Sequence, residues 1–178
     1  MKYFRIATLV LFLMPLSAMA CGPSPQKVTK EIVIKAEPAK IWALLSDFGA
    51  MQKWHPGVVA VVVESKPDTN GKDALFRTLK LKSGGSLSEK QRETQSDEMK
   101  LGVVMLEGDF GVSNYSDAIT IKPSTADGES LVTWVGRFNN KANAMQAPAG
   151  EDDATAIAAV NAFYGAGLQG LKSVLEKN

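Results

Sequence analysis

Residues 151–177, EDDATAIAAVNAFYGAGLQGLKSVLEK, form the longest stretch of this sequence with a helical pattern, and they contain no proline. Apolar side chains recur at intervals of three or four residues, which is the spacing of one buried helix face. The positions of this stripe are Ile157, Val160, Tyr164, Leu168, Leu171 and Leu175. Acidic residues at 151–153 and Lys172 and Lys177 near the end suit the helix dipole. The stretch predicts one long helix against which the rest of the chain packs.

Three glycines interrupt this helical pattern, at positions 165, 167 and 170. A glycine in a helix interior costs about 1 kcal/mol relative to alanine, so we expect something to compensate. A second stripe of small and aromatic residues, including Ala159, Phe163 and Gly167, indicates that a sheet, or a ligand held by the sheet, approaches closely. The spacing Gly165-x-Gly167-x-x-Gly170 also fits a dinucleotide-binding pattern, but no strand precedes it, so we interpret it as helix packing.

The residues before this helix have the pattern of strands. Residues 28–36 alternate, with Val28, Lys30, Ile32 and Ile34 on one face. From Val58 onward the period is two or the run is β-branched, and six further strands are predicted at 58–65, 73–82, 86–95, 99–107, 112–122 and 129–138. The breaks between them carry turn residues, as in Ser83-Gly84-Gly85 and Gly108 to Gly111.

Two short helices are predicted between the first and second strands. Glu37-Pro38 begins the first, because proline is tolerated in the opening turn. Residues 51–54 form the second, which His55-Pro56-Gly57 ends. The order of elements predicts an α+β fold, with a seven-stranded antiparallel sheet wrapped around one long C-terminal helix. We expect a cavity between the two, which a larger residue at Gly167 would fill.

The N-terminus has the composition of a targeting segment. Lys2 and Arg5 precede an apolar run at residues 6–16, and Ala18-Met19-Ala20 offers a cleavage site. We therefore predict a signal peptide at 1–20, a linker at 21–27, a single domain at 28–178 and a periplasmic location. The run is too short to span a bilayer, which takes about 20 residues, and no later stretch approaches that length. Cys21 is the candidate lipidation position or a free N-terminal thiol; a lipoprotein signal would place leucine where Ala18 stands.

Composition excludes several classes of function. Without Lys2 and Arg5 the chain has 18 basic and 19 acidic residues, which is neither a nucleic-acid footprint nor a polybasic membrane patch. His55 is the only histidine and Cys21 the only cysteine, so we expect no multi-histidine metal site, no internal disulfide and no cofactor. The sequence has no P-loop and no serine nucleophile elbow. These absences favour a non-enzymatic protein, although His55 with Glu89 or Asp117 would make an acid–base pair.

Several motifs together resemble the START-like (helix-grip, SRPBCC) superfamily, in its polyketide cyclase/dehydrase branch. They cover nearly the whole mature chain and keep the order of its elements. They are IWALLSDF at 41–48, WHPGV at 54–58, Arg77-Thr78-Leu79, Gly84-Gly85 with Glu89, Asn114-Tyr115, Val132-Thr133-Trp134 and GLQGLK at 167–172. The resemblance implies the helix-grip fold and a ligand-binding cavity.

The resemblance also implies which side chains face that cavity. Matching positions place His55, Glu89, Tyr115 and Asp117 there. Strand alternation adds Trp134 and Phe138, and the face of the closing helix adds Phe163 and Gly167. Related pockets often carry a small residue where this chain has Asp117.

Each of these residues also has a purely structural interpretation. A lone histidine before proline is commonly a capping or packing residue, and Glu89 and Arg77 can form an ordinary cross-strand ion pair. The tryptophans are commonly core residues. An outward Asp117 would be a solvated side chain, whereas an inward one would be costly if unpaired and is a candidate site residue.

A narrower resemblance is to the MxaD proteins of methylotrophic bacteria, which are periplasmic accessories of methanol oxidation. It implies a non-enzymatic exported protein that aids methanol dehydrogenase and its cytochrome c. Two alternatives stay open: a carrier or receptor for a small apolar ligand in the sheet–helix cavity, and a cyclase-like enzyme.

Overall fold

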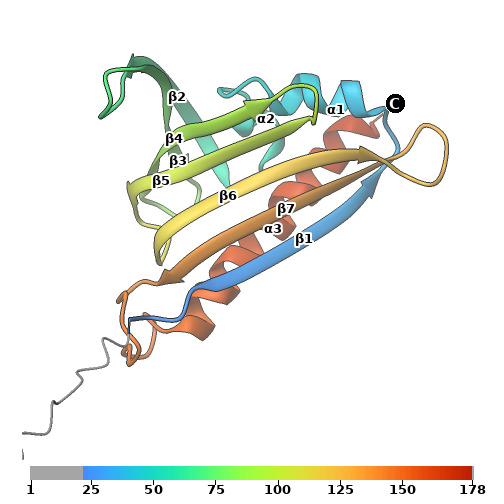
Figure 1. Cartoon of the computed structure of the whole chain (residues 1–178). Coiled ribbons are helices and arrows are strands. Elements are labelled where there is room, and N and C mark those ends of the chain that lie inside the picture. The colour runs from blue at the N-terminus through green and yellow to red at the C-terminus, as the bar shows by residue number, and fades with distance from the viewer. Residues whose placement is uncertain (1–21, 178) are drawn as a thin grey trace, which may run out of the picture.

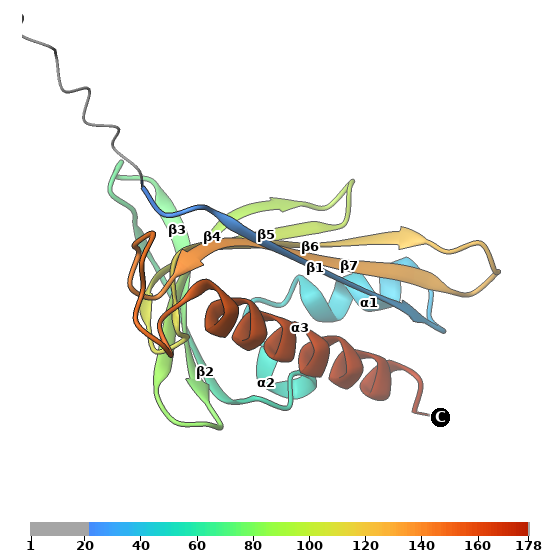
Figure 2. The same ribbon diagram turned by 90° about the horizontal axis from the view of Figure 1, so that it is seen from below.

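The structure is a computed structural model that describes residues 22–177; the predicted signal peptide and Cys21 lie outside the described residues. Figures 1 and 2 show the arrangement of its elements. They are β1 (Gln26–Ile34), α1 (Pro38–Leu45), α2 (Met51–Trp54), β2 (Val58–Pro67), β3 (Asp73–Leu81), β4 (Ser86–Gln95), β5 (Lys100–Gly108), β6 (Val112–Pro123), β7 (Ser130–Asn140) and α3 (Asp153–Leu175). The first strand begins within the predicted linker, at Gln26.

The strands form one seven-stranded antiparallel sheet in the order β1-β7-β6-β5-β4-β3-β2. Consecutive strands from β2 to β7 are neighbours, so they form a meander. The first strand joins this meander beside β7, which leaves β1 and β2 as the two edges of the sheet (Figure 1). The predicted α+β helix-grip architecture is confirmed.

Helix α3 runs along one face of the sheet, next to β1 and β7 (Figure 2). Asp152 caps its first turn, because the carboxylate accepts a hydrogen bond from the Thr155 N–H at 2.8 Å. Most of the predicted apolar stripe is buried, but Ile157 is only half-buried. Ala156 and Gly167 are buried in its place, since small residues let the sheet and its side chains come close to the helix axis.

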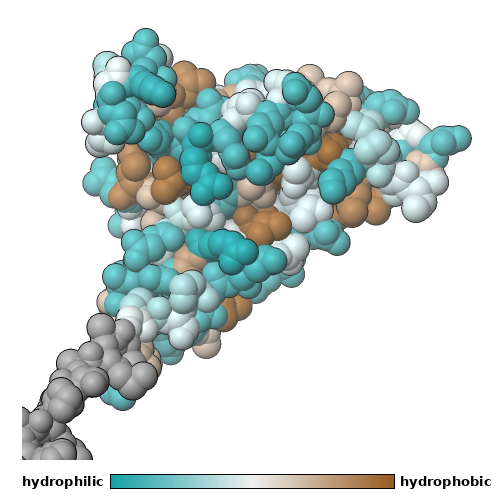
Figure 3. All heavy atoms as spheres, viewed as in Figure 1, coloured by the Kyte–Doolittle hydropathy of each residue, from teal (hydrophilic) through white to brown (hydrophobic). Residues whose placement is uncertain are grey.

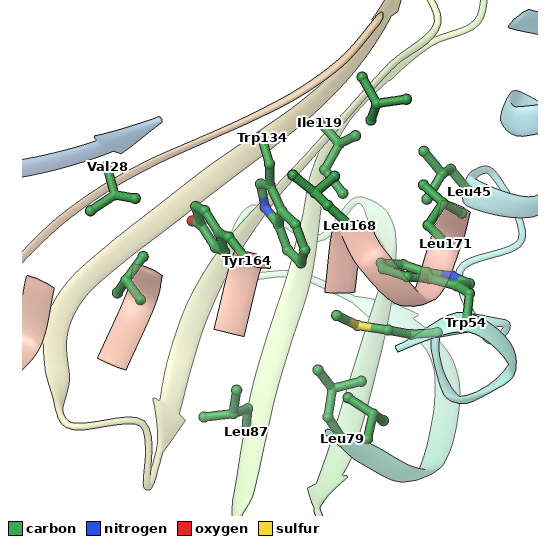
Figure 4. Packing of buried hydrophobic residues seen from close by; sticks show 14 of the residues in the cluster. Val28, Leu45, Trp54, Leu79, Leu87, Ile119, Trp134, Tyr164, Leu168 and Leu171 are labelled. Atoms are coloured by element: carbon green, nitrogen blue, oxygen red, sulfur yellow. The ribbon is translucent and has the colours of Figure 1, made fainter. Parts of the chain in front are cut away.

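The inward side chains of β7 fill much of the space beneath α3. Trp134 and Phe138 are buried, as the alternation in the sequence predicts, and Val132 on the same strand is buried too. The Trp134 ring stacks on the Tyr164 ring of α3 with centroids 4.2 Å apart (Figure 4). Each large apolar side chain buried in this way contributes roughly 1.5–3 kcal/mol to stability.

Helix α2 lies against α3 at a glycine. A Cβ atom added at Gly170 would collide with the backbone carbonyl of Trp54, so only glycine allows this approach. Gly167 faces His55 and Trp134 in the same way. An added Cβ at Gly165, by contrast, would meet nothing within 4 Å, so close packing explains two of the three helix glycines.

Within residues 22–177, no helix combines the length and the apolar character needed to cross a membrane.

Candidate functional site

His55 is buried, with 1% of its surface exposed, and both of its ring nitrogens are bonded. Nδ1 accepts a hydrogen bond from the Gly57 N–H at 3.0 Å, so the proton of the neutral ring lies on Nε2. That nitrogen donates to the Phe163 carbonyl of α3 at 3.1 Å. Burial lowers the pKa of His55 to about 4, although the Phe163 carbonyl opposes the shift. The neutral ring therefore joins the end of α2 to α3 and has no free nitrogen.

Arg77 and Glu89 form a buried ion pair across β3 and β4. They are direct partners in the strand register, and Arg77 Nε donates to Glu89 Oε2 at 2.7 Å. Arg77 Nη1 also donates to the Phe48 carbonyl at 3.2 Å, and its guanidinium lies 4.3 Å from the centroid of the Phe48 ring. The side chains of Arg77 and Glu89 are 8% and 4% exposed. Their contact in the structure is therefore the cross-strand ion pair of the structural interpretation.

Asp117 points inward and ends a chain of three buried polar side chains. The Tyr164 hydroxyl lies 2.7 Å from the Tyr115 hydroxyl, which donates to Asp117 Oδ2. Burial and then the negative charge of Glu89 raise the pKa of Asp117 to about 7, against the opposing effects of Tyr115, Trp134 and Arg77. Burial also raises the pKa of both tyrosines, so they keep their protons and act as donors.

The space beside Asp117 is very small. An internal cavity of about 10 Å³ touches Asp117, Trp134 and Arg77, which is room for one water molecule at most. The Trp134 indole N–H is buried and makes no hydrogen bond among the described residues, although it lies close enough to help lower the pKa of Asp117. Asp117 has the pKa of a proton donor or acceptor, but no substrate fits beside it in this conformation.

A larger cavity opens at the side of α3, and we call it the α3 groove. Its volume is about 530 Å³, which lies within the range of small-molecule sites. It lies between α3 and the turns that join β3 to β4 and β5 to β6. Its lining residues are His55, Gly57, Leu81, Lys82, Ser83, Asp109, Phe110, Ala159, Ala162, Phe163 and Ala166. The Phe110 and Phe163 rings meet within it, with centroids 4.9 Å apart.

The eight predicted site residues do not share one cavity. His55 and Phe163 line the α3 groove, and Asp117 and Trp134 touch the internal cavity. Glu89 lines a separate hollow of about 130 Å³ together with Arg77. The other three, Tyr115, Phe138 and Gly167, are packed in the core. Ligand binding by these residues stays a prediction.

Phe110 and Leu81 line the α3 groove but were not among the predicted site residues. The signal for them was the pair of glycine-containing turns, 83–85 and 108–111, because both turns lie beside α3. The turn residues alone do not reveal that the two turns lie beside α3, since their position depends on how far the sheet curls. For a metal, residues 22–177 offer no group of three or more histidine, cysteine, aspartate or glutamate side chains that could hold one.

Comparison with known proteins agrees with the fold. Residues 25–176 match the family described as "Polyketide cyclase / dehydrase and lipid transport". The chain is 28% identical over 118 residues to the abscisic acid receptor PYL7 of Arabidopsis thaliana, covering 61% of this chain and 54% of the receptor. It therefore spans about half the length of that curated relative.

Two solved structures show the same fold. The protein XoxI from Bacillus cereus superposes with a TM-score of 0.67 at 24% identity, covering 84% of this chain and 94% of XoxI. A START superfamily protein from Mycobacterium smegmatis gives a TM-score of 0.66 at 14% identity, with coverages of 84% and 97%. With residues 25–176 matched, this chain belongs to the polyketide cyclase/dehydrase and lipid transport family, a branch of the START-like helix-grip superfamily.

Proposed function

We propose that this protein is an exported, non-enzymatic binding protein that takes a small apolar molecule into the α3 groove. The observation that carries the proposal is the composition of that groove. Ala159, Ala162 and Ala166 line it from α3 beside the contacting rings of Phe163 and Phe110, and its volume is about 530 Å³. Apolar walls with a few polar groups at the rim are typical of sites for small hydrophobic ligands.

The comparisons support a ligand of this kind. The family description includes lipid transport, and PYL7 is named as a receptor for abscisic acid, a small organic molecule. Each is a property of a relative, and the α3 groove has room for a similar ligand in this chain.

The bonding of the polar groups favours a binding role over catalysis. Both nitrogens of His55 already hold hydrogen bonds, so the ring is not free to move a proton. Asp117 is not among the residues that line the groove, and it touches the cavity of about 10 Å³. A cyclase-like reaction needs an acid–base pair within reach of its substrate. Neither Asp117 nor His55 meets that requirement in the groove.

The groove is tested with N-phenyl-1-naphthylamine, an uncharged apolar fluorophore. We expect saturable binding, which Ala162→Glu should weaken by roughly tenfold or more because the bound probe desolvates the new charge. Ala154→Glu is the matched control: it adds the same charge to an exposed alanine of α3 that does not line the groove. Binding that does not saturate, or that both variants weaken equally, would contradict the proposal.

A second candidate is the accessory role that the MxaD resemblance implies, toward methanol dehydrogenase and its cytochrome c. Two surface features favour it. Asp109 and Phe110 of the turn at 108–111 form part of the groove wall, and Met145 is 62% exposed on the loop at 141–150. A partner protein would therefore find an exposed apolar side chain, Met145, on one loop and an exposed charged side chain, Asp109, on the other. If equimolar protein leaves electron transfer from the dehydrogenase to the cytochrome unchanged and binds neither, this candidate is excluded.

A further inference from the structure

The β2 edge, which we define as residues 61–67, is an unpaired edge of the sheet. Among residues 22–177, strand β2 pairs only with β3, and residues 62–67 are all exposed, including Val62 and Val63 at 57% and 40%. Figure 3 shows apolar side chains among hydrophilic ones on the outer face, where Figure 1 draws β2 to β5. Strand edges with exposed β-branched residues readily pair with another strand.

At the opposite edge of the sheet, α3 caps the end of β1. Lys172 Nζ donates to the Val33 carbonyl at 2.9 Å, and the Lys35 N–H donates to Glu176 Oε1 at 2.7 Å. On β2 a similar cap exists at one position, where the Val61 N–H donates to Gln52 Oε1 at 2.7 Å. Among the contacts of residues 22–177, no side chain caps the backbone of β2 beyond Val61.

The Gln52 cap also shows which backbone groups of β2 point away from β3. Backbone groups alternate in direction along an antiparallel strand. Because the Val61 N–H points outward to Gln52, the N–H and carbonyl groups of Val63 and Ser65 point outward as well. These groups are arranged to form a second antiparallel ladder.

We propose that the β2 edge joins two copies of this chain, paired antiparallel about a two-fold axis at Ser65. In this register the two Ser65 residues exchange two backbone hydrogen bonds, and each Val63 N–H reaches the partner's Pro67 carbonyl. Because the two-fold axis uses the β2 edge of each copy once, the assembly closes as a dimer.

The charges on β2 select this register. With the axis at Ser65, Glu64 lies opposite the partner's Lys66, twice in the dimer. An axis at Glu64 or at Lys66 would instead place like charges opposite each other, which is destabilising. An axis at Val63 would need the Val61 N–H, which Gln52 already occupies. Within one chain Glu64 and Lys66 lie 2.9 Å apart, and both side chains are more than half exposed, so they remain available to a partner.

The oligomeric mass of the purified protein tests this inference by sedimentation and light scattering. We expect the mass of two chains for the wild type. Glu64→Lys and Lys66→Glu should each raise the dimer dissociation constant by roughly tenfold or more, because each places like charges opposite. Mixing these two variants should restore a dimer, and so should the double variant. A wild type that stays monomeric at about 100 µM, or single variants that dimerise as well as the wild type, would overturn it.

A backbone variant tests the ladder itself. Val63→Pro removes an outward N–H without removing a bond to β3, so it should lower dimerisation by a similar factor. Thr29→Pro is the matched control, because its N–H points outward at the β1 edge, and it should leave the mass unchanged. Should Val63→Pro fail to fold, the Glu64→Lys and Lys66→Glu variants, alone and mixed, still test the proposal. Ala162→Glu, which tests the α3 groove, should leave the dimer intact, so the two proposals fail separately.

Discussion

Asp117 and His55 are buried titratable side chains whose pKa values are shifted in opposite senses. Burial holds a proton on Asp117, whose pKa rises from 3.8 to about 7. Burial removes a proton from His55, whose pKa falls from 6.5 to about 4. Both groups are therefore neutral in the folded protein across mildly acidic pH, because burial away from water disfavours the charged form of each side chain.

The two shifts have opposite consequences for stability. The contribution of Asp117 is fully present below pH 3.8 and is lost as the pH rises toward 7, because the unfolded chain releases the proton first. The contribution of His55 is present above pH 6.5 and is lost as the pH falls toward 4, because the unfolded chain takes up the proton first. Between about pH 4 and 6.5 the two slopes oppose each other, at about 1.4 kcal/mol per pH unit each.

We predict that Asp117→Asn removes this balance. The stability of the variant relative to the wild type should increase by ~4 kcal/mol as the pH rises from about 4 to 7, because the amide needs no proton. Urea unfolding at several pH values measures this difference. Asp97→Asn, the same change in an exposed turn, is the control and should follow the wild type. A constant difference between Asp117→Asn and the wild type would show that Asp117 ionises normally in the fold.

At the scale of the element, the glycines of α3 show where the helix is in close contact. An added Cβ at Gly167 would lie 2.6 Å from His55 Cδ2 and 2.8 Å from Trp134 Cζ3. Cβ atoms do not approach ring atoms so closely, so even alanine overpacks this position. The expectation that a larger residue would fill an empty cavity here is wrong, because the two rings already occupy the space.

Gly167→Ala is therefore predicted to destabilise the protein by about 1–3 kcal/mol, despite the better helix propensity of alanine. Gly165→Ala is its matched control on the same helix. With nothing within 4 Å of an added Cβ, the control should be neutral or more stable by up to ~1 kcal/mol. Chemical denaturation of both variants gives the comparison, and equal effects would show that α3 does not press on His55 and Trp134 as described.

At the scale of the whole molecule, export is part of the proposed function and is testable by mass. Cleavage after Ala20 should give an N-terminus at Cys21 in an envelope fraction. Intact-mass measurement distinguishes a free thiol from a lipidated cysteine, because a diacylglyceryl group adds mass. Recovery of a cytoplasmic chain that retains residues 1–20 would contradict both export and the periplasmic accessory role.

The sequence by itself determined the elements and their order. Alternation in β1 and β7, the three-to-four spacing in α3 and the turn residues between strands are local patterns, and a local pattern decides a local conformation. The Arg77–Glu89 pair was foreseeable for a related reason, because the two residues face each other across one hairpin. The helix-grip resemblance came from motifs kept in the same order as these elements.

Only the tertiary structure decided where the molecule has space. The bond between His55 and Phe163 joins residues 108 positions apart, and Gly167 presses on rings from two other elements. A cavity is the volume left after such distant side chains have packed, so no single segment contains the information. For this reason the predicted pocket beneath α3 is nearly filled, while open space lies beside the helix, where the curl of the sheet brings two turns toward it.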